Sequence, residues 1–182
     1  MNRYCVFLRG INVNGVSIQM AALRQALENM GYQDVKTVLA TGNVIIALED
    51  GAIPETHKTG IENGLAEAFS YDAHVLLRSA AEVLALLEAA SGISVPEGCH
   101  LYALLIEEQE ALISLGQAFL QASHGADEQF VPLHRDAFWV VQKGETLHTE
   151  FGTKVLGSKR YKSVLTSRNI NTVKKVAALM HD

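Results

Sequence analysis

The stretch YCVFLRGINVNG, residues 4–15, joins an apolar run to a loop rich in glycine and asparagine. The β-branched and aromatic residues predict a strand over residues 3–9, which the following glycine ends. From Met20 the apolar residues recur at helical spacing, with Ser17 available as a cap before them and Gly31 as a C-terminal stop. The chain is therefore predicted to open with a strand, a loop and an amphipathic helix.

Four further elements complete the first half. Two short β-rich runs, residues 35–39 and 44–48, are separated by the hairpin-type turn ATGN, and a weaker helix carries apolar residues at four-residue intervals around Leu65. Residues 74–77 form another strand. This β-α-β-β-α-β order is the ferredoxin-like plan, in which two helices cover one face of a four-stranded antiparallel sheet.

The second half shows a related pattern. Ser79 and Glu82 form a capping box that starts a third helix, and residues 92–98 are the natural boundary between two lobes. After it come an apolar strand, a helix, two paired strands and a last helix from Ile170. We therefore expect an α+β protein of two ferredoxin-like lobes, β-α-β-β-α-β over residues 1–91 and a related β-α-β-β-α with a basic C-terminal helix over residues 92–182. No convincing sequence repeat accompanies this similarity.

Composition indicates a folded chain in a reducing compartment. The 182 residues are 48% hydrophobic, which is ample for a core without disulfides. Cys5 and Cys99 each lie in an apolar, strand-like run, which is typical of buried thiols. The N-terminus lacks the pattern of a signal peptide, and no apolar run reaches the roughly 18 residues of a membrane helix. A cytoplasmic location without membrane attachment is the resulting expectation.

Charge is distributed unevenly. The net charge is −5, yet the last 31 residues contain seven basic residues and one acid, so the rest of the chain carries −11. A cationic tail on an acidic body suits an anionic ligand, an anionic polymer, or docking of the tail on the protein's own acidic surface.

The glycine- and asparagine-rich loop is the first candidate site. Exposed amides in such a loop can bind an oxyanion beside the Arg9 guanidinium and the side chains of Asn12 and Asn14, and the following helix would add its N-terminal dipole. The spacing is that of neither a Rossmann nor a P-loop glycine motif. The alternative is a tight strand-to-helix turn whose asparagines bond their own backbone.

A second segment with similar chemistry is TSRNINT, residues 166–172. Arg168, Asn169 and Asn171 near a helix start suit a phosphate or carboxylate, because unpaired helix amides and a guanidinium favour the same charge. The alternative is that Asn169 or a neighbouring hydroxyl caps the last helix while Arg168 pairs with an acid of the first lobe.

Other chemistry finds little support. The seven histidines and two cysteines do not follow the spacing of a metal-binding or catalytic motif, so we expect no metal, no cofactor and no cysteine nucleophile. His134, Asp136, His148 and Glu150 could converge across a hairpin, although scattered surface residues are the favoured interpretation. Whether the protein is an enzyme stays open. Residues 44–48 lack the aromatics that stack bases on ferredoxin-like sheets, so nucleic acid would have to meet the basic tail.

With both ends described, the chain resembles domain-of-unknown-function family 1697. The resemblance rests on five groups of residues: Arg9-Gly10-Ile11-Asn12-Val13, Met20 with Leu23, residues 31–37, Gly42-Asn43-Val44, and Thr166-x-Arg168-Asn169-x-Asn171-Thr172 with Lys175. The chain departs from the pattern at Ile170, where an aromatic is usual, and at Thr41, where serine is common. The resemblance implies two ferredoxin-like lobes and supplies no catalytic roles.

Three functions are compatible with these observations. The leading hypothesis is binding of a small anionic ligand, such as a nucleotide or phosphate ester, in a cleft bordered by Arg9, Asn12, Asn14, Arg168, Asn169 and Asn171. The alternatives are nucleic-acid binding through the basic tail, and a structural homodimer whose tail docks on the partner's acidic face.

Overall fold

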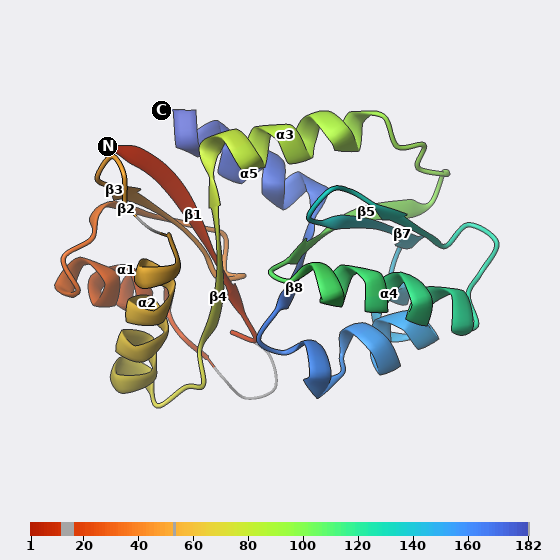
Figure 1. Ribbon diagram of the computed structural model, residues 1–182, viewed down its shortest axis with the longest axis horizontal. Helices are drawn as coiled ribbons and strands as arrows, with labels where there is room; N and C mark the ends of the chain where they lie inside the picture. Colours follow the sequence, from red (N-terminus) through yellow and green to blue (C-terminus); the bar gives the residue numbers. More distant parts are fainter. Residues whose placement is uncertain (12–16, 53, 182) are drawn as a thin grey trace. The chain divides into compact units, whose positions relative to one another are not determined.

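Two four-stranded antiparallel sheets with accompanying helices make up the computed structural model of this chain, which describes residues 1–11, 17–52 and 54–181 (Figure 1). This architecture confirms the predicted α+β class. Among the described residues, no helix has both the length and the apolar character needed to cross a membrane.

The elements follow one another in two similar series. The first series is β1 (Asn2–Arg9), α1 (Met20–Asn29), β2 (Gln33–Val38), β3 (Asn43–Leu48), α2 (Pro54–Phe69), β4 (His74–Ser79) and α3 (Ala80–Ser91). The second is β5 (Cys99–Ile106), α4 (Gln109–Gln121), β6 (Gln129–Pro132), β7 (Ala137–Gln142), the short helices η1 (Glu145–Leu147), η2 (Phe151–Leu156) and η3 (Lys159–Tyr161), β8 (Leu165–Asn169) and α5 (Ile170–His181).

The first sheet has the order β2-β3-β1-β4, so the first strand of the chain lies in its centre. Alternate residues of the strands, among them Val6 and Leu8, pack with α1 and α2 through Leu23, Leu27 and Ile61. The strands place apolar side chains at every second residue and α1 places them at helical spacing, so each element has one apolar face. These apolar faces pack together in this core.

The opposite face of the first sheet is buried as well. Cys5 and Phe7, which alternate with the helix-facing residues, are fully buried, and all six residues of β3 are buried. The Arg3 Nη1 donates to the carbonyl oxygen of Met180 at 3.0 Å, which ties the end of α5 to β1. The expectation of helices on one face is therefore incomplete for this sheet, since the far end of the chain contributes to its second face.

The second sheet repeats the arrangement, with the order β6-β7-β5-β8. Its fourth strand, β8, was not expected, since Leu165–Asn169 pair with β5, whereas the last helix begins at Ile170 as predicted. The sequence LTSRN carries little β signal by itself, and its pairing partner is β5, which lies far earlier in the chain. Between β7 and β8 the helix of the first series is replaced by η1, η2 and η3.

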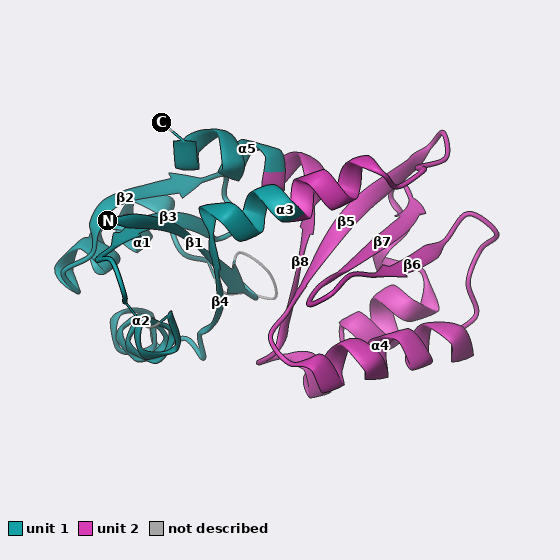
Figure 2. Ribbon diagram, turned by 45° about the horizontal axis from the view of Figure 1, so that its top comes forward, with its two compact units in different colours: residues 1–85, 174–182 teal, residues 86–173 magenta. Residues whose placement is uncertain are grey.

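The chain divides into two compact units, residues 1–85 with 174–182, and residues 86–173 (Figure 2). The division falls inside α3 and α5, each of which contributes residues to both units. The boundary expected at residues 92–98 stays a prediction.

Two local predictions have distinct outcomes. Ser79 and Glu82 form the expected capping box: the Ser79 N–H donates to Glu82 Oε2 at 2.8 Å, and the Glu82 N–H donates back to Ser79 Oγ at 3.3 Å. In contrast, Ser17 does not cap α1, which begins after Gln19 without a side-chain cap. Both cysteines are free thiols, Cys5 buried and Cys99 half-buried.

Candidate anion-binding site

Arg9 ends β1 and lies on the sheet face opposite α1 and α2, because the neighbouring Leu8 packs toward those helices. In the register of β1 and β4, Arg9 is directly opposite His74, so the two side chains leave the same face. The Arg9 side chain is half-buried, and this loss of water lowers the pKa of its guanidinium. The strand end thus holds a partly desolvated cation beside an imidazole.

Two groups surround this strand end. The Tyr71 hydroxyl donates to the Arg9 carbonyl oxygen, which ties the approach to β4 against the end of β1. His74 Nε2 lies 3.5 Å from Asp72 Oδ2, so a protonated His74 would have an acidic neighbour. The sequence pattern does not indicate that His74 is a neighbour of Arg9. The signal lay in the strand register, which composition does not show.

Arg168 lies in β8 with its side chain buried. Its Nη1 donates to Thr166 Oγ1 at 2.8 Å and to the Ser167 carbonyl oxygen at 2.8 Å. These bonds fold the guanidinium back on its own strand. Arg168 therefore orders the segment that leads into α5.

Asn169 caps α5. Its Oδ1 accepts the backbone N–H of Asn171 at 2.9 Å, which satisfies one of the orphan donors of the first turn. This is the capping role given as the alternative for the segment. The side chain of Asn171 is exposed in the first turn of the helix. Of the three predicted C-terminal residues, Asn171 is the one whose side chain faces solvent.

The family model described as Protein of unknown function (DUF1697) matches residues 1–138 of the chain. This protein belongs to the DUF1697 family. The match covers all strands of the first sheet and β5 and β6 of the second, and it ends near the start of β7, before residues 166–172.

A solved structure shares this fold. The structure of the conserved bacterial protein SP0830 from Streptococcus pneumoniae superposes on the DUF1697 chain with a TM-score of 0.75, covering 100% of this chain and 99% of that one, at 22% sequence identity. At this identity the likeness concerns the fold alone. No curated protein matches the chain.

In this DUF1697 chain the six candidate residues fall into three groups. Arg168, Asn169 and Asn171 lie together where β8 passes into α5. Arg9 belongs to the first unit, whereas Arg168 belongs to the second. Asn12 and Asn14 lie outside the described residues. The meeting of the two segments in one cleft stays a prediction.

The polar residues around the second hairpin have structural partners. The buried Asp136 accepts the backbone N–H of Ile106 through Oδ1 at 2.8 Å, which joins β7 to the end of β5. Glu150 accepts the Ser123 N–H at 2.9 Å and the Lys154 ammonium at 2.9 Å, and these donors lower the pKa of its carboxyl. Over residues 1–11, 17–52 and 54–181, no group of three or more His, Cys, Asp and Glu side chains could hold a metal ion.

Proposed function

We propose that this DUF1697 chain binds a small anionic ligand, such as a phosphate ester or a nucleotide, through Arg9 at the end of β1. The observation that carries the proposal is the half-buried guanidinium, whose pKa is lowered by desolvation, directly across the β1–β4 pair from His74. An anion gains more from a cation in such a place than from one in open water, because the lower dielectric strengthens the attraction. A guanidinium also offers two parallel donors that match a phosphate.

Arg168, Asn169 and Asn171 form a second, separate part of this proposal, as further donors to the same ligand. Their support is the exposed Asn171 side chain beside the start of α5, in a segment held by the Arg168 and Asn169 bonds. Because its side chain is exposed, substitution of Asn171 should change ligand binding with the least effect on the stability of the fold. Asn12 and Asn14 complete the proposed set from the sequence.

A thermal-shift titration with phosphate, pyrophosphate, AMP and ATP tests the proposal on the wild type, Arg9→Gln and Arg24→Gln. Arg24 is the matched control, because it is an exposed arginine of α1 that pairs only locally, with Glu28 at 2.7 Å. A ligand at 100 times its Kd stabilises by about 2.7 kcal/mol, which raises Tm by roughly 5–10 °C in a chain of this size. We expect this rise in the wild type and Arg24→Gln and its loss in Arg9→Gln.

Equal shifts in Arg9→Gln and the wild type would refute the role of Arg9. Asn171→Ala tests the second segment by itself: retention of the full shift in this variant would remove the C-terminal residues from the site and leave the Arg9 part standing.

Nucleic-acid binding is the second candidate, because Lys159, Arg160 and Lys162 stand exposed within and beside η3. Three cations so close together would contact successive phosphates. The measurement is fluorescence anisotropy of labelled single-stranded RNA over a salt series, with wild type and a Lys159→Gln/Arg160→Gln variant. If the protein binds nucleic acid at this segment, its affinity should fall steeply as the salt concentration rises, and the dependence of affinity on salt should be weaker in the variant. Absence of binding at low salt would refute this second candidate function.

A further inference from the structure

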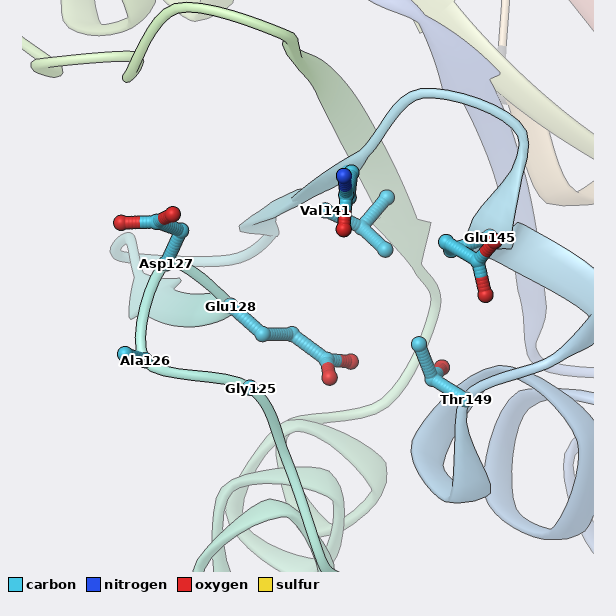
Figure 3. A pocket seen from close by; sticks show the side chains of 8 residues that line it. Gly125, Ala126, Asp127, Glu128, Val141, Glu145 and Thr149 are labelled. Atoms are coloured by element: carbon cyan, nitrogen blue, oxygen red, sulfur yellow. The ribbon is translucent and has the colours of Figure 1, made fainter.

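A pocket of about 260 Å³ lies within the second unit, between the loop that leads into β6, the end of β7 and the turn around η1 (Figure 3). Its wall includes three carboxylates, Asp127, Glu128 and Glu145, together with Thr149 and the apolar side chain of Val141. All of these residues belong to the compact unit of residues 86–173. The cavity is therefore a property of one unit and is acidic, unlike the cationic strand end of Arg9.

Glu128 is the decisive residue of the pocket. Only 7% of its surface is exposed, and its Oε1 accepts the indole N–H of Trp139 at 2.9 Å. Trp139 is itself buried against Tyr102 and Phe151, so the carboxylate is held in place. Figure 3 shows the carboxylate directed into the pocket. Within the described part of the chain, no hydrogen-bond donor reaches its second oxygen, Oε2.

Glu145 and Thr149 complete the acceptor set. Figure 3 shows the Glu145 carboxylate entering from the side opposite Glu128, and the Thr149 hydroxyl near it, while Asp127 points away from this space. Neither Glu128 nor Glu145 has a lysine or arginine partner among the residues that the structure describes. The nearby Glu150 differs, because Lys154 and the Ser123 N–H bind its carboxylate.

The pocket therefore has an excess of negative charge that a bound cation would neutralise. A carboxylate removed from water is costly unless it is paired, and ionised carboxylates only accept hydrogen bonds. Two carboxylates and a hydroxyl oxygen around one space match the three donors of an ammonium group. The pocket suits a metal ion less well, since the described residues contain no group of three or more His, Cys, Asp or Glu that could hold one.

We infer that the pocket binds the primary ammonium group of a small alkylamine, with the ammonium between Glu128, Glu145 and Thr149 and the alkyl stem against Val141. The volume is slightly below the roughly 300–1,000 Å³ of drug-sized pockets, which favours a small amine over a nucleotide. This site does not depend on the proposed anion site, because it shares no residue with it and takes the opposite charge.

The chain supplies its own reporter, since Trp139 is its only tryptophan and bonds directly to Glu128. The experiment is a titration of the full chain with n-butylamine at neutral pH, followed by tryptophan fluorescence and by calorimetry. Butan-1-ol serves as the neutral ligand of equal length. We expect a saturable signal with butylamine and none with butanol.

Three variants define the site. Glu128→Gln keeps an oxygen acceptor for the Trp139 N–H and removes the charge, and Glu145→Gln removes the second charge from a partly exposed turn. Each should weaken binding at least tenfold, while Glu97→Gln, which changes an exposed acid that does not line the pocket, should leave it unchanged. Should Glu128→Gln fail to fold, Glu145→Gln decides alone.

Two outcomes would overturn the inference. One is the absence of both a saturable fluorescence change and a heat of binding with butylamine in the wild type. The other is binding that Glu145→Gln and Glu97→Gln weaken equally, which would reduce the effect to overall charge. Neither outcome concerns Arg9, so the proposal that Arg9 binds an anionic ligand is tested independently.

Discussion

Arg78 and Arg168 occupy the same position in the two sheets. Arg78 pairs with Cys5 of the central strand β1, and Arg168 pairs with Ala103 of the central strand β5. Both are buried, and each donates its Nη1 to the carbonyl oxygen of the preceding residue, at 2.9 Å for Arg78 and 2.8 Å for Arg168. In both cases the next residue, Ser79 or Asn169, caps the helix that follows.

This correspondence extends the internal repeat from topology to individual side chains. The two sheets share their strand order, and their fourth strands enter a helix through a buried arginine and a polar cap. Local sequence similarity is too low to show this, because HVLLRS and LTSRN have only the arginine in common at the aligned positions. We conclude that the arginine and the cap are the parts that the architecture needs at this corner.

The first prediction concerns the buried arginine of the second sheet. Arg168→Ala removes the donor to Thr166 Oγ1 and to the Ser167 carbonyl oxygen, and Thr166 is buried. An unsatisfied buried group costs about 1–3 kcal/mol, so we expect a loss of that size or greater in the free energy of unfolding, measured by urea titration. Arg24→Ala, on the exposed face of α1, should change it by less than about 0.5 kcal/mol. Equal effects of the two substitutions would contradict the structural role.

The second prediction concerns the cap of α5. Asn169→Ala removes the acceptor of the Asn171 N–H and should destabilise by about 0.5–2 kcal/mol. Asn169→Ser keeps a capping oxygen and should retain most of the stability. Thermal unfolding followed by circular dichroism compares the two variants, at about 2–4 °C of Tm per kcal/mol. A serine variant as unstable as the alanine variant would show that Asn169 acts otherwise than as a cap.

The third prediction concerns the turn before β3. Gly42 has a φ of +71°, and a Cβ there would lie 3.0 Å from Leu8 Cβ and 3.1 Å from Ile11 Cγ2. Gly51 has a φ of +81° with nothing within 4 Å, so it shares the backbone strain without the overlap. Both alanine variants should lose about 1–2 kcal/mol from the left-handed backbone, and Gly42→Ala should lose distinctly more. Urea midpoints of the two variants provide the measurement; equal losses would disprove the overlap.

The fourth prediction concerns pH. The Ser123 N–H and Lys154 lower the folded-state pKa of Glu150 below the ordinary 4.5. A carboxyl with a depressed pKa stabilises the fold above its unfolded pKa, and this stability is lost as the pH falls through the folded value. The stability advantage of the wild type over Glu150→Gln should therefore be full at pH 7 and shrink below pH 4.5. Urea unfolding at pH 7, 5 and 3 follows it; an advantage that is constant with pH would contradict the ionic contribution.

Elements with a strong local pattern could be predicted from the sequence. The helix from Met20, the hairpin of β6 and β7 and the Ser79 capping box are all present, because each rests on residues a few positions apart. The strand β8 could not be predicted, since its five residues form a strand only through pairing with β5. Burial of the second face of the first sheet was also out of reach, as it depends on the end of α5 reaching β1.

For the candidate site residues, too, some properties can be predicted from the sequence and others depend on the tertiary structure. The sequence identifies Arg9 and Arg168 as cations next to flexible or capping residues, and Asn169 as a capping candidate. Only the tertiary structure places His74 opposite Arg9, turns Arg168 back on its own strand, and surrounds Glu128 and Glu145 with one pocket. Strand and helix periods and turn chemistry can be read from the amino-acid order alone, because they act between near neighbours. The tertiary structure decided which charges are buried and which face a cavity, because burial and pairing depend on residues brought together from distant parts of the chain.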